Sequence, residues 1–160
     1  MDSRDFLKFT SSVLAQQRGS LEALVFFNSC QERVLQGIVN AIEVFGVPEI
    51  YADRHGLRVR LSGCTEAQSL FAVDCGTGRP VGVAVYVRSD IEHVMVLHIG
   101  IAREFASGGA RAREQLLLRL LRELRRCSLQ VKGVRRMQLY YLNGRAQGRV
   151  RSDSADKALA

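Results

Sequence analysis

The hydrophobic pattern of the chain is clearest between His93 and Leu142. The run Val94–Ala102 (VMVLHIGIA) is apolar at nearly every position, which predicts a strand that is covered on both faces inside a sheet. An amphipathic helix follows, with arginines on one face and an apolar stripe on the other, made of Leu116, Leu117, Leu120, Leu121 and Leu124. Val134–Leu142 then alternates as a second strand. Because a helix of this length separates them, we expect the two strands to be parallel, in a right-handed crossover.

Shorter alternating segments precede this unit. Ser69–Asp74 predicts a strand, and after the loop Cys75–Arg79 a further strand opens at Pro80, with one face made of Val81, Val83, Val85 and Val87. The turn Ser89–Asp90 leads back into the strand at Val94. The sequence therefore predicts an antiparallel meander of three strands that continues into the crossover unit.

The N-terminal part predicts helices. Ser3–Gln17 is expected to be a helix that ends at the break Arg18–Ser20, and its inward residues would be Phe6, Leu7, Val13 and Leu14. Leu21–Phe27 fits either a strand or a helix. Ser29 and Glu32 have the spacing of a capping box, and the helix that they open is closed at Gly46–Pro48. Leu57–Leu61 alternates as a strand.

These elements together predict an α/β (α+β) fold in which a mixed sheet has helices on both faces. A chain of 160 residues, 47% of them hydrophobic, suits one domain with its own core. We expect that domain to span residues 1–144. The polar segment 145–160 is expected to be a disordered tail.

Composition indicates a cytoplasmic protein. No apolar run is long enough to span a bilayer, and the first five residues do not resemble a secretory signal. The four cysteines contain no C-x-x-C pair, so reduced thiols are expected rather than disulfides or a zinc site; they are Cys30, Cys64, Cys75 and Cys127. No metal site is predicted.

The net charge of +7 is concentrated in one part of the chain. Residues 103–151 contain 13 Lys or Arg against 3 Glu, a balance of +10, which leaves −3 for all other residues. Such a basic segment suits a polyanionic ligand, either a phosphorylated cofactor or nucleic acid. The alternative for individual arginines is a solvated helix face.

The segment Arg103–Arg113, between the central strand and the helix, has small residues in its middle. Such a turn can bring backbone N–H groups close to an anion, and the helix that follows adds the positive end of its dipole. The turn also lies at the C-terminal end of the first parallel strand, where such sheets usually bind ligands. We therefore expect the ligand to be anchored at this turn.

The order of the elements resembles the GNAT superfamily of acyl-CoA-dependent N-acetyltransferases over residues 69–146. The resemblance is carried by the hairpin LFAVDCGTGRPVGVAVYVRSD, the strand VLHIGIA with Glu104 and Phe105 after it, the glycine-containing turn, the leucine-rich helix and the strand RRMQLYYL. It implies acetyl-CoA as the acyl donor and a primary amine as the acceptor. The strand would pair with the pantetheine arm, and the turn would bind the pyrophosphate through its amides. The cofactor-binding residues so implied are Ile99, Ile101, Ala102, Ser107, Gly108, Gly109, Ala110, Arg111, Ala112, Arg113 and Asn143.

The chain departs from the family pattern at three places. The family's turn has Gln or Arg, two residues, Gly, one residue, and Gly or Ala, whereas here either Gly109 fills the first glycine position with a later helix start, or Arg111 and Arg113 replace small residues. Asn143-x-x-Ala146 matches the next family motif, but Val150 stands near the place of the usual tyrosine. The closing helix and strand pair of the family are missing, unless an earlier segment or a second subunit, in a homodimer, replaces them.

The expected chemistry needs a base for the amine and an acid for the departing thiolate. By alternation, His98 and Gly100 share the face opposite Leu97, Ile99 and Ile101, so His98 could line the acceptor side as the base. Tyr140, on the parallel neighbour, is the candidate acid. The alternative for His98 is a hydrogen-bonded core residue.

Two other functions fit the sequence. A catalytically silent domain of the same fold would bind acyl-CoA or only a protein partner, which accords with the altered turn and the missing tyrosine. A basic nucleic-acid-binding protein is less favoured, because the arginines have no interleaved aromatic residues and most have the spacing of a solvated helix face. No membrane partner is expected.

Overall fold

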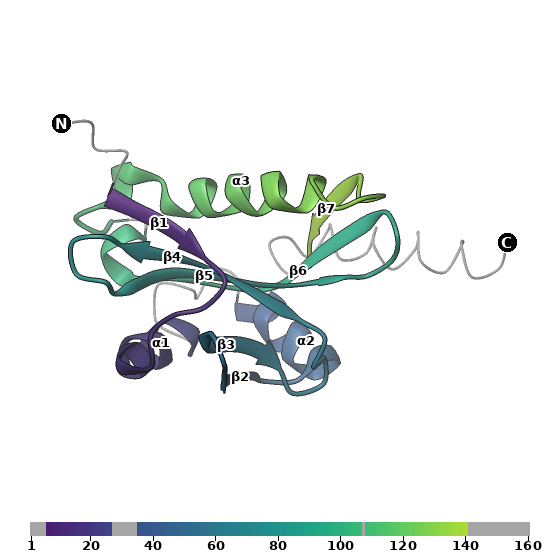
Figure 1. Cartoon of the computed structure of the whole chain (residues 1–160), viewed down its shortest axis with the longest axis horizontal. Helices are drawn as coiled ribbons and strands as arrows, with labels where there is room; N and C mark the ends of the chain where they lie inside the picture. The colour runs from purple at the N-terminus through teal and green to yellow at the C-terminus, as the bar shows by residue number, and fades with distance from the viewer. Residues whose placement is uncertain (1–5, 27–34, 107, 141–160) are drawn as a thin grey trace, which may run out of the picture.

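The fold is a mixed α/β architecture built around a five-stranded mixed sheet. The structure is a computed structural model that describes residues 6–26, 35–106 and 108–140. Helix α3 covers one face of the sheet, whereas α1, α2 and a separate two-stranded sheet lie on the other (Figure 1). The expected mixed sheet with helices on both faces is confirmed.

The large sheet has the strand order β1-β4-β5-β6-β7. Its strands are β1 (Leu7–Thr10), β4 (Gln68–Asp74), β5 (Pro80–Arg88), β6 (His93–Ile101) and β7 (Arg136–Leu139). Neighbouring strands are antiparallel except β6 and β7, which are parallel. The predicted three-strand meander is therefore β4-β5-β6, and the predicted parallel crossover joins β6 to β7. Both predictions are confirmed.

Helix α3 (Leu116–Leu129) follows the predicted apolar stripe. Leu116, Leu120 and Leu124 are fully buried against the sheet, while Leu118 is exposed on the outer side. Gly82 on β5 faces this stripe, and a β-carbon there would lie at an ordinary contact distance, 3.5 Å, from side-chain carbons of Leu116 and Leu120. Burial of this stripe removes the leucines from water and provides most of the helix's stabilisation.

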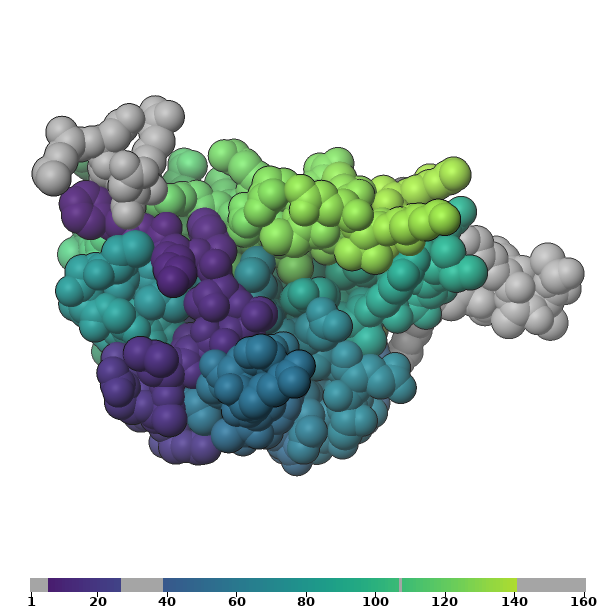
Figure 2. All heavy atoms as spheres, viewed as in Figure 1, coloured from purple at the N-terminus to yellow at the C-terminus, as the bar shows by residue number. Residues whose placement is uncertain are grey.

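The opposite face is covered by short elements from the N-terminal half. They are α1 (Arg18–Val25), α2 (Leu35–Phe45) and the hairpin β2 (Pro48–Asp53) with β3 (Gly56–Leu61). α1 buries Leu21, Leu24 and Val25, and β3 buries every second residue from Leu57. The space-filling view shows these segments packed together beneath the sheet (Figure 2).

The predicted N-terminal helix is wrong. Leu7–Thr10 forms the edge strand β1, which pairs with β4 from Leu7↔Asp74 to Thr10↔Phe71, and only a short 3-10 turn forms at Ala15–Gln17. Leu7 and Val13 are buried as predicted, but Phe6 and Leu14 are exposed. Hydrogen bonds from a distant strand edge have therefore outweighed the local helical pattern.

Two neighbouring predictions also change. Arg18–Ser20, expected to be a break, is the first turn of α1, which resolves Leu21–Val25 as helix. Strand β2 was not predicted, because its residues are all half-buried or exposed and do not alternate. The predicted helix closed at Gly46 is confirmed as α2, whose proposed capping box lies outside the described residues.

A β-bulge interrupts β6 at Leu97. Val85 pairs with His98 whereas its neighbour Tyr86 pairs with Val96, so Leu97 is an extra residue. Val96 and His98 therefore point to opposite faces, although they are two residues apart. β7 pairs with β6 from His93↔Arg136 to Val96↔Leu139, and the backbone N–H of Tyr140 donates one further hydrogen bond to the Val96 carbonyl.

No helix in the described part of the chain is long and apolar enough to cross a membrane. Cys64, Cys75 and Cys127 are free thiols, and Cys30 lies outside the described residues. The polar segment 145–160 also lies outside them.

Candidate active site

The C-terminal half of β6 brings several of the predicted residues together. Ile99 and Ile101 lie on the α3 side, since their partners on β5 are Ala84 and Gly82 and Gly82 faces α3. Ala102 ends the strand by donating its amide to the Val81 carbonyl at 2.8 Å. The predicted ligand-binding end of the strand thus pairs with β5, whereas β7 pairs only with the first half of β6, from His93 to Val96.

His98 lies on the other face, beneath α1. It is buried, and its Nε2 is 3.0 Å from the Val25 carbonyl at the C-terminal end of that helix. Because a carbonyl can only accept, Nε2 carries the proton, and the bond satisfies one of the helix's terminal carbonyls. Burial lowers the pKa of His98, and the hydrogen bond to Val25 opposes that effect only in part. The imidazole is therefore neutral at pH 7.

The contact between α1 and β6 is unusually close next to His98. A β-carbon on Gly100 would lie 2.3 Å from the Leu24 carbonyl oxygen, so only glycine fits at this position. His98 and Gly100 therefore dock the end of α1 onto the sheet. This is the core role that the sequence left open for the histidine, and it leaves Nδ1 as the atom that a catalytic base would have to use.

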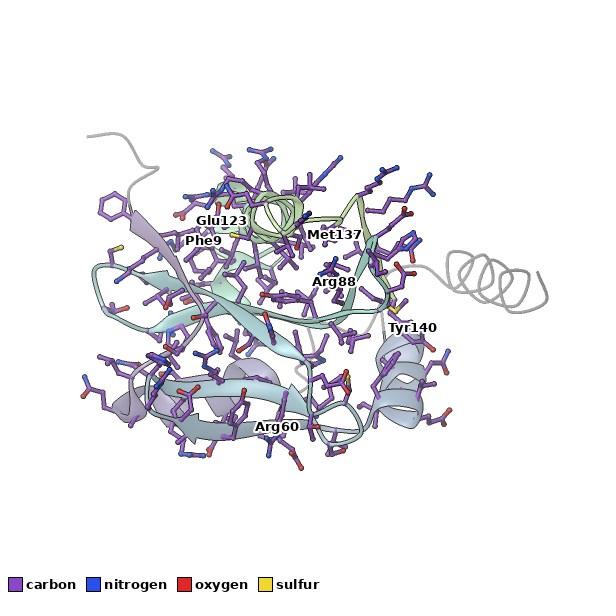
Figure 3. The ribbon with its side chains drawn as sticks, turned by 45° about the vertical axis from the view of Figure 1, so that its right-hand side comes forward. Phe9, Arg60, Arg88, Glu123, Met137 and Tyr140 are labelled. Atoms are coloured by element: carbon purple, nitrogen blue, oxygen red, sulfur yellow. The ribbon has the colours of Figure 1, made fainter. Side chains whose placement is uncertain are left out.

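Tyr140 is buried on the same side of the sheet as His98. Its ring meets that of Phe45 on α2 edge to face, with centroids 5.0 Å apart. The side-chain view shows Tyr140 beside the end of α2 (Figure 3). The two predicted catalytic residues thus share a face, His98 beneath α1 and Tyr140 beside α2.

The predicted phosphate turn is a compact, internally bonded loop. It contains 3-10 turns at Arg103–Phe105 and Ala112–Glu114, and Gln115 takes a left-handed conformation just before α3. Six of its amides donate to carbonyls within the loop, namely those of Ala106, Gly109, Arg111, Ala112, Glu114 and Gln115. Among the described residues after Ala106, the amides of Gly108, Ala110 and Arg113 make no such bond. Many amides of the turn are therefore used within the loop itself, and fewer are left for an anion.

The two glycines of the turn differ. A β-carbon on Gly109 would lie 2.4 Å from the Glu104 carbonyl oxygen, so this glycine is required by packing within the turn. Gly108 has a positive φ of 82° and nothing within 4 Å of the place of a β-carbon. Open space for a ligand therefore lies at Gly108, while Gly109 shapes the loop behind it.

Arg111 holds the turn in place. Its guanidinium bonds Asp74 at 3.0 Å and Glu114 at 2.8 Å, and it lies 4.4 Å above the centre of the Phe105 ring. Burial alone would raise the pKa of Asp74, but the Gly76 amide and Arg111 lower it overall. The charge of Arg111 is compensated by two carboxylates, and its ion pair with Asp74 connects the turn to the end of β4. Arg113 and Ala110, in contrast, are exposed, and Ala112 is half-buried.

A hollow of about 430 Å³ opens beside the end of β6. Its walls come from Gly19, Ser20 and Ala23 on α1 and from Arg79, Ala102 and Arg103 around the sheet edge. Arg79 forms an ion pair with Glu104 at its rim. The sequence analysis missed the α1 wall, although the spacing of the small residues Gly19 and Ala23 on one helical face could have indicated it.

A second hollow of about 460 Å³ lies under the C-terminal end of α3, away from the turn. Tyr86, Arg88, Cys127 and Val134 are among its lining residues. Burial raises the pKa of both the Tyr86 hydroxyl and the Cys127 thiol, so neither is activated as a nucleophile.

Two predicted residues cannot be placed, because Ser107 and Asn143 lie outside the described residues. In the part of the chain that the structure describes, no group of three His, Cys, Asp or Glu residues could hold a metal ion. No protein-family model matches the chain, and neither does any curated protein or solved structure that was compared with it.

Proposed function

We propose that the chain is an acyl-CoA-dependent N-acetyltransferase that moves an acetyl group from acetyl-CoA to a primary amine in the cytoplasm. The observation that carries the proposal is the parallel unit β6-turn-α3-β7, with a glycine turn and a hollow at the C-terminal end of β6. The same unit carries the resemblance of the sequence to the GNAT superfamily.

The described residues around the turn fit a phosphorylated donor. Gly108 leaves open space, the amides of Gly108, Ala110 and Arg113 make no bond within the turn, and Arg103 lines the adjoining hollow. The start of α3 contributes the positive end of its dipole. In this proposal Ile99, Ile101 and Ala102 form the strand along which the pantetheine arm lies.

The reaction forms an N–C bond and breaks the C–S bond of the thioester. The amine must lose a proton to a base, and the thiolate must gain one. In this proposal, Tyr140 donates to the thiolate. His98 accepts the amine proton at Nδ1, because Nε2 already carries a proton and donates it to the Val25 carbonyl. The lowered pKa of His98 keeps the imidazole neutral, as a base requires.

Binding is tested first by a thermal-shift titration with acetyl-CoA. A ligand that binds only the folded state raises the melting temperature by mass action. Gly108→Asp should abolish the shift because it places a negative charge at the open glycine, whereas Gly108→Asn, which tolerates the same positive φ, should retain most of it. A full shift with Gly108→Asp would mean that the donor does not bind at this turn.

Turnover is tested by detecting free CoA thiol with a panel of primary amines. We expect release that depends on the amine and is lost in Tyr140→Phe, provided that this variant still binds acetyl-CoA. Absence of any melting shift and of any release would refute the proposed function.

A second candidate, a catalytically silent domain that binds acyl-CoA, is favoured by a specific set of contacts. His98 already bonds the end of α1, and Arg111 is held by Asp74 and Glu114. These contacts give both residues a structural role that a domain without catalytic activity would also need. Acetyl-CoA binding without release of CoA for any amine would select this candidate.

A further inference from the structure

The outer surface of α3 and the segment after it form a strongly basic face. We define this α3 basic face by its seven basic residues, which are Arg119, Arg122, Arg125, Arg126, Lys132, Arg135 and Arg136. All but Arg119, which is half-buried, are exposed. Glu123 is the sole acidic residue between positions 118 and 136, and it pairs with Arg126. Blue nitrogen-tipped side chains gather over the outer side of α3 in Figure 3.

Five of the seven basic residues of this face have no acidic partner in the described structure. In the described structure, Arg122, Arg125, Lys132, Arg135 and Arg136 take part in no ion pair. The opposite layer differs, because its exposed hairpin pairs Arg58 with Asp53 and Arg60 with Glu49. A cluster of one charge sign on a single face attracts polyanions, so the excess charge points to an anionic partner.

We propose that the α3 basic face binds the phosphate backbone of double-stranded nucleic acid without reading its sequence. Six of the seven basic residues are arginines, whose planar guanidinium groups suit bidentate contacts with phosphate. Four of the arginines lie on α3, a helix of 14 residues and about 21 Å, and the other basic residues follow its C-terminal end, so the face can follow several phosphates.

Other polyanions fit this face less well. Single strands are usually held by stacking on aromatic rings, and residues 118–136 contain none. Membrane-bound helices insert their apolar face, but the apolar face of α3 is buried in the core through Leu116, Leu120 and Leu124. The sequence analysis disfavoured nucleic acid partly because the arginines have no aromatic residues between them. That absence counts against single-stranded nucleic acid but not against a duplex.

The test measures fluorescence anisotropy of a labelled 20-base-pair duplex of random sequence with the full chain, from 50 to 300 mM salt. The variant Arg122→Gln/Arg125→Gln should bind at least about tenfold more weakly and lower the slope of log Kd against log salt by about 1.8, for two lost phosphate contacts. The control Arg18→Gln/Arg54→Gln removes the same charge from the opposite layer and should change binding less than about twofold. Circular dichroism of both variants confirms that they are folded.

Several results would overturn the proposal. They are no duplex binding at 50 mM salt, equal weakening by both double variants, tighter binding of a single strand than of the duplex, or binding of phosphatidylserine vesicles or polyglutamate in place of the duplex. Since acetyl-CoA is absent from these assays, failure here is distinguishable from failure of the proposed transferase function.

Discussion

The two faces of the central sheet are covered by different kinds of structure. On one face a single long helix, α3, buries a regular stripe of leucines and exposes Arg122 and Arg125, which take part in no ion pair in the described structure. On the other, α1, α2 and the β2-β3 hairpin each cover a small area, and Arg58 and Arg60 on β3 are paired with Asp53 and Glu49. The packing on the α3 side depends on leucines that repeat along one helix. The α1 side depends on specific contacts, such as His98 with Val25 and Gly100 with Leu24.

The largest effect is expected from the leucine stripe. Leu120→Ala should lower the free energy of unfolding by about 2–5 kcal/mol, because Leu120 is fully buried between α3 and the sheet. Leu118→Ala, on the same helix but 54% exposed, should change it by less than about 0.5 kcal/mol. Urea denaturation measures both. Equal losses would mean that α3 does not pack on the sheet by this stripe.

Replacing a glycine by alanine should affect the stability differently on the two faces of the sheet. Gly100→Ala should destabilise the protein by about 1–3 kcal/mol, because its β-carbon would meet the Leu24 carbonyl oxygen at 2.3 Å and α1 would have to move. Gly82→Ala faces α3, where the nearest atoms are side-chain carbons at 3.4 and 3.5 Å, and should be neutral or stabilise by up to about 1 kcal/mol. Thermal and urea unfolding show which of the two variants is less stable. If Gly82→Ala were the less stable one, that result would contradict the described docking of α1.

Acid should weaken the α1 side through His98. The pKa of His98 is lowered in the folded state by burial, so below about pH 6.5 the unfolded chain binds a proton that the folded chain does not. Stability should therefore fall as the pH drops below about 6.5, by up to about 1.4 kcal/mol per pH unit.

His98→Gln keeps an N–H donor for the Val25 carbonyl but does not titrate, so it should flatten this part of the pH profile. His55→Gln, which makes the same substitution at an exposed turn, is the control. Urea denaturation between pH 5 and 8 tests this. An unchanged slope in His98→Gln would show that another group causes the acid sensitivity.

The smallest effect is expected at the turn. Arg111→Met should lower stability by about 1 kcal/mol, since it leaves the largely buried Asp74 without its cation. Arg113→Met should leave stability unchanged but weaken acetyl-CoA binding in calorimetry, if the proposed donor site is correct. Loss of stability from Arg113→Met and none from Arg111→Met would reverse the roles assigned to the two arginines.

Local periodicity allowed the α3 side to be predicted from the sequence. β5 and α3 repeat their apolar residues with the period of their own element and β6 is a nearly continuous apolar run, so no distant contact was needed to recognise them. The N-terminal segment shows the limit. Leu7–Thr10 becomes a strand because β4 offers it a free edge, and nothing within the segment itself indicates that partner.

The location of the candidate site could be predicted from the sequence, but the contacts of its side chains could not. The end of β6 and the turn follow from the strand-turn-helix pattern. The role of Arg111 depends on Asp74, which lies on another strand, and that of His98 depends on a backbone carbonyl of α1. The bulge at Leu97 changes which residues share a face, and no residue type in the sequence marks it. Such contacts are set by the tertiary structure.

The pairing of β1 with β4 bears on how the chain folds. The whole segment α1 to β3 lies between these two strands in the sequence, whereas β4, β5 and β6 are joined by short turns. Closing the longer loop costs more chain entropy, so β1 is expected to join the sheet after the meander has formed. During synthesis, β1 leaves the ribosome well before β4, and its apolar residues would stay accessible to chaperones until β4 appears.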